Sequence, residues 1–270
     1  GPADILVLPE SIEQLREVLK VVKETVVPLT LLGNGSNVLV RDKGIRGIVI
    51  KLGNMLRHFY EAEDMLVFGS GYSLALASYK AMECEKTGME FAVGIPGSIG
   101  GAVYMNAGAY DGEMQNIVNC VKVMDLQGNE RVLTAEELNF GYRKTSLQNS
   151  GLIVTEVTLK MPSGNKDEIK SKMDDFSHRR ISKQPLEMPS AGSMFKRPPG
   201  YFAGTLIDQA GLKGYTVGGA QISTKHAGFV VNVGGATAAD VLQLIKDVQT
   251  KIKAGVGVEL QPEVLVIGEE

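Results

Sequence analysis

The clearest periodic pattern in the chain follows Ser11. Apolar residues recur at spacings of three and four over residues 12–22, and Gln14 stands three residues after Ser11, so the sequence predicts an amphipathic helix that opens with a capping box. Short runs rich in β-branched and aliphatic residues flank it and predict strands at 5–8, 29–32, 38–40 and 47–51. The chain therefore opens as a small α/β unit.

Similar patterns continue along the rest of the chain. They predict a strand at 65–68, a helix over 73–86, strands at 117–125, 131–133 and 152–161, and an amphipathic helix that ends near residue 181. Thr134 and Glu137 predict a short capped helix. Four prolines interrupt regular structure over 184–199, where we place a domain boundary. Beyond it we expect helices at 202–210 and 237–253 and strands at 215–217, 228–233, 256–260 and 263–267.

Composition narrows the possible partners. The 28 basic and 31 acidic residues give a net charge of −3, so the chain lacks the positive field that holds nucleic acid. No apolar run is long enough for a membrane span and no leader pattern opens the sequence, so we expect a cytoplasmic protein with no membrane partner. Cys84 and Cys120 form no CxxC pair, which argues against a zinc site, and we predict no metal.

Glycine is abundant, with 32 residues in 270, and gathers in two motifs. The first, GNGSNVLV at 33–40, joins two predicted strands and can turn backbone N–H groups toward an anion such as a phosphate, although a tight β-turn explains it as well. The second, GIPGSIGGAVYMNAGAY at 94–110, is almost uncharged. It suits a segment lying against a flat cofactor, with a buried packing corner as the alternative.

Further motifs carry a family resemblance. With the two glycine-rich strings, the chain has GYRKTS at 141–146, QPLEMPSAGSMFKRP at 184–198, GYFAGTLIDQAGLKGYTVGGAQISTKHAGFVVN at 200–232 and LQPEV at 260–264. In this order they resemble the UDP-N-acetylenolpyruvoylglucosamine reductase family, in its shorter subtype without an extra substrate-covering loop. The resemblance implies a flavoprotein oxidoreductase of peptidoglycan precursor synthesis in bacteria, with bound FAD and with NADPH as the hydride donor.

The resemblance also implies an α+β fold. An FAD-binding domain of the p-cresol methylhydroxylase-like type would consist of two α/β subdomains, at 1–55 and 56–182, and a smaller α/β substrate-binding domain would span 183–255. We expect the C-terminal strands over 256–270 to return to the second subdomain. We also expect residues upstream of the opening GPAD. Leu265 stands where many relatives carry arginine, which leaves any ligand contact of that side chain in doubt.

Functional residues carry over by motif. The resemblance implies that the cofactor-binding residues are Gly33, Asn34, Gly35, Ser36, Asn37, Gly94, Ile95, Pro96, Gly97, Ser98, Gly100, Gly101, Asn106, Ala107 and Gly108. The substrate, UDP-N-acetylglucosamine enolpyruvate, carries a diphosphate, and its implied binding residues are Tyr142, Lys183, Arg197, Gln221 and His226.

Three residues match the catalytic positions of the family. Arg143 and Glu263 match the pair that stabilises the negative charge of the enolate, and Ser193 matches the proton donor. Glu263 must be protonated to donate, a form that burial would favour. Without the resemblance, Arg143 and Glu263 are more typical of solvated charges and Ser193 of a turn residue.

Two other functions fit part of this pattern. An FAD-dependent oxidase would share the fold, but the AGSMFKRP and PEV strings belong to the reductase resemblance. A non-catalytic module that binds flavin or a nucleotide sugar would not need Arg143, Ser193 and Glu263 together. We therefore favour the reductase, acting on a small molecule, and infer no obligate protein partner.

Overall fold

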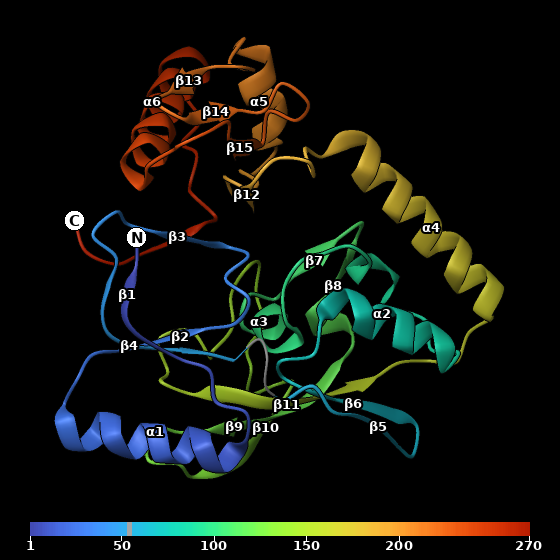
Figure 1. Cartoon of the computed structure of the whole chain (residues 1–270). Coiled ribbons are helices and arrows are strands. Elements are labelled where there is room, and N and C mark those ends of the chain that lie inside the picture. The colour runs from blue at the N-terminus through green and yellow to red at the C-terminus, as the bar shows by residue number, and fades with distance from the viewer. Residues whose placement is uncertain (53–55) are drawn as a thin grey trace. The chain divides into compact units, whose positions relative to one another are not determined.

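The computed structural model describes residues 1–52 and 56–270 (Figure 1). These residues form two compact units. The larger unit comprises residues 5–35 and 47–178, and the smaller unit comprises 1–4, 36–46 and 179–270. The chain passes from one unit to the other within β1 (Ala3–Val7), β4 (Ile45–Lys51) and α4 (Lys166–Lys183), and also between residues 35 and 36.

An antiparallel five-stranded sheet forms the centre of the larger unit. Its order is β10 (Glu130–Thr134), β9 (Val118–Met124), β11 (Ile153–Lys160), β6 (Met65–Gly69) and β5 (Phe59–Ala62). Helices α2 (Leu74–Glu83) and α3 (Ile99–Tyr104) pack on one face through an apolar cluster that includes Phe68, Val157 and Leu159. The 3₁₀ turn η1 (Glu90–Ala92) lies between α2 and α3 in the chain. The hairpin of β7 (Gly108–Ala109) and β8 (Gly112–Glu113) and the 3₁₀ turn η2 (Met114–Asn116) follow α3.

The opposite face of this sheet packs against α1 (Ile12–Thr25), as Figure 1 shows. Leu15 and Leu19 are buried with Ile50, Met124 and Ile153, which confirms the predicted apolar face of the helix. A register irregularity in β11 lies between residues 154 and 156. Such a bulge breaks the alternation of side chains, so residues 154 and 157, three apart, both join the α2 and α3 cluster.

Ser11 caps the start of α1 as predicted, but the pattern differs from the predicted capping box because Gln14 bonds to the N–H of Glu10 and not to that of Ser11. The Ser11 Oγ accepts a hydrogen bond from the Gln14 N–H at 3.2 Å, and the Gln14 side chain accepts one from the Glu10 N–H at 2.8 Å. After α1, β2 (Leu29–Leu32) pairs in parallel with β4 in a sheet of order β1-β4-β2. The predicted strand–helix–strand opening is therefore confirmed.

The smaller unit contains a four-stranded antiparallel sheet of order β12 (Ser190–Ser193), β15 (Phe229–Asn232), β14 (Ala220–Ile222) and β13 (Thr216–Val217). Helices α5 (Ala203–Gln209) and α6 (Ala238–Val256) share its apolar core. In the same unit β3 (Val38–Val40) pairs in parallel with β16 (Leu265–Ile267). The Asp42 carboxylate accepts hydrogen bonds from the Ala238 and Ala239 N–H groups at 2.7 and 2.9 Å, so the segment after β3 holds the start of α6.

The C-terminal strands differ from the prediction. We expected residues 256–270 to return to the second subdomain, but β16 pairs with β3 instead and takes no place in the five-stranded sheet. Residues 256–260 form no strand, because α6 continues to Val256 and ends at Gly257, whose φ is +76°. The predicted boundary at residues 55 and 56 falls beside residues 53–55, which lie outside the described part of the chain. The domain limits themselves stay predictions.

Two short elements were also predicted incorrectly. The segment 184–199 contains β12, whose Ser190–Ser193 stretch lacks an apolar alternation and forms a strand through its pairing with β15. Thr134 and Glu137 exchange the two predicted capping hydrogen bonds, at 2.8 and 3.3 Å, but these close a turn with no helix after it. In the described residues, no helix combines the length and apolar character that a membrane crossing requires.

Candidate active site

The two glycine-rich motifs meet in the larger unit. A Cβ added at Gly33 would lie 2.8 Å from the Ser98 Oγ and 3.9 Å from the Gly101 Cα. Asn34 and Gly35 are exposed, and Gly35 has a φ of +72°, which favours glycine. Glycine at position 33 therefore permits the close approach of a phosphate-type loop to the second motif.

The second motif joins the end of β6 through main-chain hydrogen bonds. The Gly100 N–H donates to the Ser70 carbonyl and the Ile99 N–H to the Tyr72 carbonyl, both at 2.9 Å. We predicted no regular structure in this segment, but Ser98 caps α3 by accepting from the Gly101 N–H at 3.3 Å, and Ile99 is fully buried. The helix forms because this cap and the buried apolar face outweigh the glycines.

One buried hydroxyl at this junction lacks a partner in the described part of the chain. Ser70 is 2 % exposed, and its Oγ makes no hydrogen bond there. A Cβ added at Gly100 would lie 2.8 Å from the Ser70 Cβ, so the serine is directly beside the second motif. An unsatisfied buried hydroxyl indicates a group that the described chain does not itself supply.

The GYRKTS motif packs against the far end of the second glycine-rich motif. The Arg143 guanidinium donates to the carbonyl oxygens of Asn106 and Gly108, at 3.4 and 3.1 Å. The fully buried Asn106 side chain donates in turn to the Gly141 carbonyl at 3.0 Å and to the Glu113 carboxylate at 3.1 Å. Two motifs that are about 35 residues apart are therefore fixed to each other by reciprocal hydrogen bonds.

Arg143 occupies a tight turn. The Gly141 and Lys144 main chains bond to each other at 2.9 and 3.1 Å, and Arg143 lies between them with a φ of +54°. A left-handed backbone costs an arginine about 1 kcal/mol or more relative to an unstrained conformation. The Gln148 side chain donates to the Arg143 carbonyl at 3.1 Å and supports the turn.

Ser193 and Glu263 lie on neighbouring segments of the smaller unit. Ser193 ends β12, and its Oγ donates to the Phe195 carbonyl at 3.3 Å. The Glu263 N–H donates to the Met194 carbonyl at 2.8 Å, and the Lys196 N–H donates to the Gln261 carbonyl at 2.8 Å. Glu263 is half-buried. A main-chain hydrogen bond thus joins Glu263 to Met194, the residue that follows Ser193, so the segments of two predicted catalytic residues 70 positions apart in sequence are side by side.

Comparisons with known proteins agree on one family. The FAD binding domain family matches residues 3–134, and the C-terminal domain of UDP-N-acetylenolpyruvoylglucosamine reductase matches residues 184–267. The reductase of Clostridioides difficile is 50% identical over 270 residues, all of this chain and 89% of its own length, and that of Geobacillus thermodenitrificans is 50% identical over all of this chain and 88% of its own. The crystal structure of the reductase from Thermus caldophilus matches with a TM-score of 0.82 and 39% identity, over 97% of this chain and 91% of that one.

The chain belongs to the UDP-N-acetylenolpyruvoylglucosamine reductase family.

Membership of this reductase family confirms the predicted enzyme class and fold. The chain is an FAD-dependent oxidoreductase with an α+β fold of the p-cresol methylhydroxylase-like type. The structure suits the cofactor, because Asn34 and Gly35 are exposed and directly follow Gly33, which approaches the second motif, and because the Ser70 hydroxyl, which has no partner in the described residues, lies beside Gly100 of that motif. The individual cofactor contacts stay predictions. The amide of Asn106 is already bonded to Gly141 and Glu113 within the protein.

The predicted substrate residues differ in their exposure and in the contacts that their side chains make within the protein. Arg197 lies 4.0 Å over the Phe202 ring, and Lys183 is exposed at the end of α4. Gln221 donates to the Thr216 hydroxyl at 3.0 Å. In the larger unit, the Tyr142 ring is 52% exposed and stacks under the Arg143 guanidinium.

His226 is held more tightly than the other substrate candidates. Its Nδ1 accepts a hydrogen bond from the Gly228 N–H at 3.0 Å, and its ring lies edge-on to Phe229. Burial, followed by the positive charges of Lys213 and Lys183, lowers the pKa of His226. The lowered pKa favours the neutral ring, and a neutral ring whose Nδ1 accepts carries its proton on Nε2.

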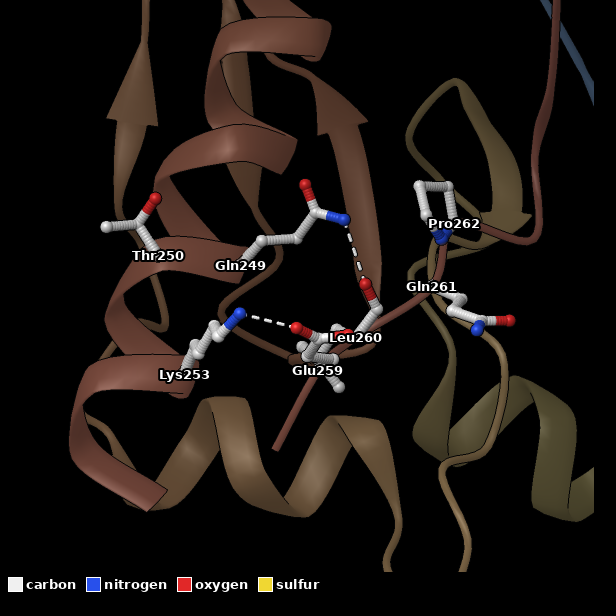
Figure 2. A pocket seen from close by; sticks show the side chains of 7 residues that line it. All are labelled: Gln249, Thr250, Lys253, Glu259, Leu260, Gln261 and Pro262. Atoms are coloured by element: carbon white, nitrogen blue, oxygen red, sulfur yellow. Dashed lines mark hydrogen bonds and ion pairs between the residues drawn. The ribbon is translucent and has the colours of Figure 1, made fainter. Parts of the chain in front are cut away.

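Residues around Glu263 were missed by the sequence analysis. The Gln249 side chain donates to the Leu260 carbonyl at 2.8 Å, and Lys253 pairs with Glu259 (Figure 2). The Asn37 Nδ2 donates to the Glu263 carbonyl at 3.1 Å, although Asn37 was predicted as a cofactor residue. Gln249 is half-buried and Lys253 is exposed, and neither belongs to a motif, so the sequence carries no signal for these contacts.

Proposed function

We propose that the chain reduces UDP-N-acetylglucosamine enolpyruvate to UDP-N-acetylmuramate, with NADPH as the electron donor. The observation that carries the proposal is the main-chain link between the segments of Ser193 and Glu263, since both residues match catalytic positions of the family. Family membership over the whole chain supports the same reaction. The cytoplasmic location and the independence from protein partners stay predictions.

FAD, when bound, supplies the hydride chemistry, because it takes a hydride from NADPH and can pass it to a second substrate. We assign the binding of its phosphates to the main chain of residues 33–37, and the flat part of the cofactor to residues 94–101 and 106–108. The uncharged side chains of these segments exclude water from the flavin without competing for its hydrogen bonds.

Arg143 stabilises the charge that develops on the substrate. Reduction of the enolpyruvyl double bond at its methylene places negative charge on the neighbouring carbon and the attached carboxylate. A guanidinium suits this charge because it stays protonated and donates several parallel hydrogen bonds. In the structure the Arg143 guanidinium donates to two carbonyl oxygens, and Gln148 donates to the Arg143 carbonyl. The guanidinium therefore needs little reorganisation when the charge appears.

Ser193 and Glu263 act on the same part of the substrate. Ser193 delivers the proton to the carbon next to the carboxylate, and Glu263 in its protonated form donates a hydrogen bond to the carboxylate. The Ser193 hydroxyl makes a long bond to the Phe195 carbonyl, at 3.3 Å, which it can exchange for a substrate contact at small cost. Lys183, Arg197, Gln221, His226 and Tyr142 are assigned to the sugar diphosphate and the uridine.

Visible absorbance of the purified protein under anaerobic conditions tests the proposal. We expect a yellow protein that bleaches when NADPH is added and recovers its colour when UDP-N-acetylglucosamine enolpyruvate follows. Recovery with air alone, and not with the enolpyruvyl sugar, would replace the reductase with an oxidase. A protein that binds FAD and never bleaches would support a binding module instead.

A further inference from the structure

The main chain of Glu263 is hydrogen-bonded at both of its polar atoms. Its N–H donates to the Met194 carbonyl at 2.8 Å, and its carbonyl accepts from the Asn37 Nδ2 at 3.1 Å. The main chain of Asn37 adds a third bond, because its carbonyl accepts from the Leu265 N–H at 3.0 Å. All of these atoms belong to the smaller unit.

We propose that Asn37 is a positioning residue for the reaction, whose side-chain amide fixes the main chain from which the Glu263 carboxyl projects. The inference rests on the role assigned to Glu263 under the proposed function. It gives the Asn37 side chain a role different from the predicted contact with the cofactor.

The chemistry of asparagine suits this role. The carbonyl of Glu263 needs a donor, and the amide Nδ2 supplies one, whereas an aspartate at the same place offers two acceptors and repels it. Directly after this contact, Val38 and Leu265 begin the parallel pairing of β3 with β16. The Asn37 side-chain amide therefore continues the contact between the two strands two residues beyond Leu265, to Glu263, which bears the carboxyl.

A comparable brace lies three residues earlier on the same segment. The Gln249 Nε2 donates to the Leu260 carbonyl at 2.8 Å, and this bond is partly buried like that of Asn37 (Figure 2). Loss of either amide leaves one carbonyl of residues 260–263 without its side-chain donor. The two bonds differ in that only the Asn37 bond reaches the residue that bears the carboxyl, so Gln249 provides a matched control.

The test measures the two half-reactions of the full-length holoenzyme separately by stopped-flow absorbance. Asn37→Ala, Asn37→Asp, Gln249→Ala, Glu263→Ala and the double variant Asn37→Ala with Glu263→Ala are compared. We expect Asn37→Ala to slow recolouring by UDP-N-acetylglucosamine enolpyruvate about tenfold, because small misplacements of a catalytic group have effects of this order or larger. Bleaching by NADPH should change less than about twofold, and Gln249→Ala should change both rates less than about twofold. The double variant should be no slower than Glu263→Ala alone.

Hydrogen exchange of the peptide that contains residues 260–265 gives a readout independent of turnover. Asn37→Ala should speed its exchange, and Asn37→Asp, which keeps the size of the side chain, serves if the alanine variant fails to fold. Equal recolouring rates for wild type and Asn37→Asp would overturn the inference, as would equal slowing by Asn37→Ala and Gln249→Ala. If Glu263→Ala recolours at the wild-type rate, the role of Glu263 in the proposed function is wrong, and the inference falls with it.

Discussion

Substitution of Gly33 by alanine tests whether contact between the two glycine-rich motifs builds the FAD site. The added Cβ would lie 2.8 Å from the Ser98 Oγ, about 0.6 Å inside the 3.4 Å at which ordinary contacts begin. The next atom, the Gly101 Cα, is 3.9 Å away and accepts the methyl group without movement. The collision is therefore with a single atom, the Ser98 hydroxyl oxygen.

That oxygen caps α3, so it can move aside only by breaking its bond to the Gly101 N–H. Loss of a serine cap costs about 1 kcal/mol. If losing the cap destabilises the FAD-bound protein by this amount relative to the free protein, the dissociation constant for FAD rises about fivefold. Ser98→Ala should weaken binding by a similar factor. The double variant should bind no more weakly than Ser98→Ala, because the colliding atom is then absent.

The assay is a titration of the FAD-depleted protein with FAD, followed by quenching of flavin fluorescence, for wild type, both single variants and the double variant. Gly35→Ala provides the contrast: position 35 has a φ of +72°, and a Cβ added there would meet none of the described residues within 4 Å, so its cost comes from backbone strain and is independent of Ser98. Additive effects of Gly33→Ala and Ser98→Ala, or wild-type affinity in Gly33→Ala, would refute the packing argument.

Two further predictions address the smaller unit. Ser193→Ala should leave bleaching by NADPH intact but slow recolouring by the enolpyruvyl sugar on the order of 10²-fold, the usual scale of positioned acid catalysis, and equal slowing of both half-reactions would contradict this role. The pKa of His226 is lowered in the folded protein, so the unfolded chain binds the proton of this residue more readily. The neutral histidine therefore contributes to stability above about pH 6.5, and this contribution is lost as the pH falls below that value. Urea midpoints measured from pH 8 to pH 5 should fall less steeply in His226→Gln than in wild type; parallel curves would show that this histidine does not titrate with folding.

The parts of the fold that could be predicted from sequence are those whose signal is local. The helix over 12–22 shows its apolar spacing and its cap in consecutive residues, and the strands at 29–32 and 38–40 have the bounds that the apolar runs indicate. The predictions for β12 and β16 were wrong because their signal is not local. The residues of β12 are small and polar, and β16 pairs with a strand about 227 residues away, so partners distant in sequence decide both elements.

The same division applies to the candidate site. The motifs indicated which segments matter, and the structure connects two pairs of them, residues 33 with 98 and residues 106–108 with 143. The hydrogen bonds that hold Glu263 escaped prediction, because Asn37 lies 226 positions earlier in the sequence. A pattern of small polar residues indicates a loop with available main chain, but it does not indicate which side chain turns inward.

The GNGSN motif shows how one short string can serve two purposes. Gly33 and Gly35 belong to the larger unit, where one permits a close contact and the other a left-handed turn. The chain then enters the smaller unit, and within two residues Asn37 is bonded to Glu263. The glycines act through the absence of a side chain, whereas the asparagine acts through its amide. Substitutions at the two ends of the motif should therefore have different effects: those at position 33 weaken the binding of FAD, and those at position 37 slow its reoxidation by the enolpyruvyl sugar.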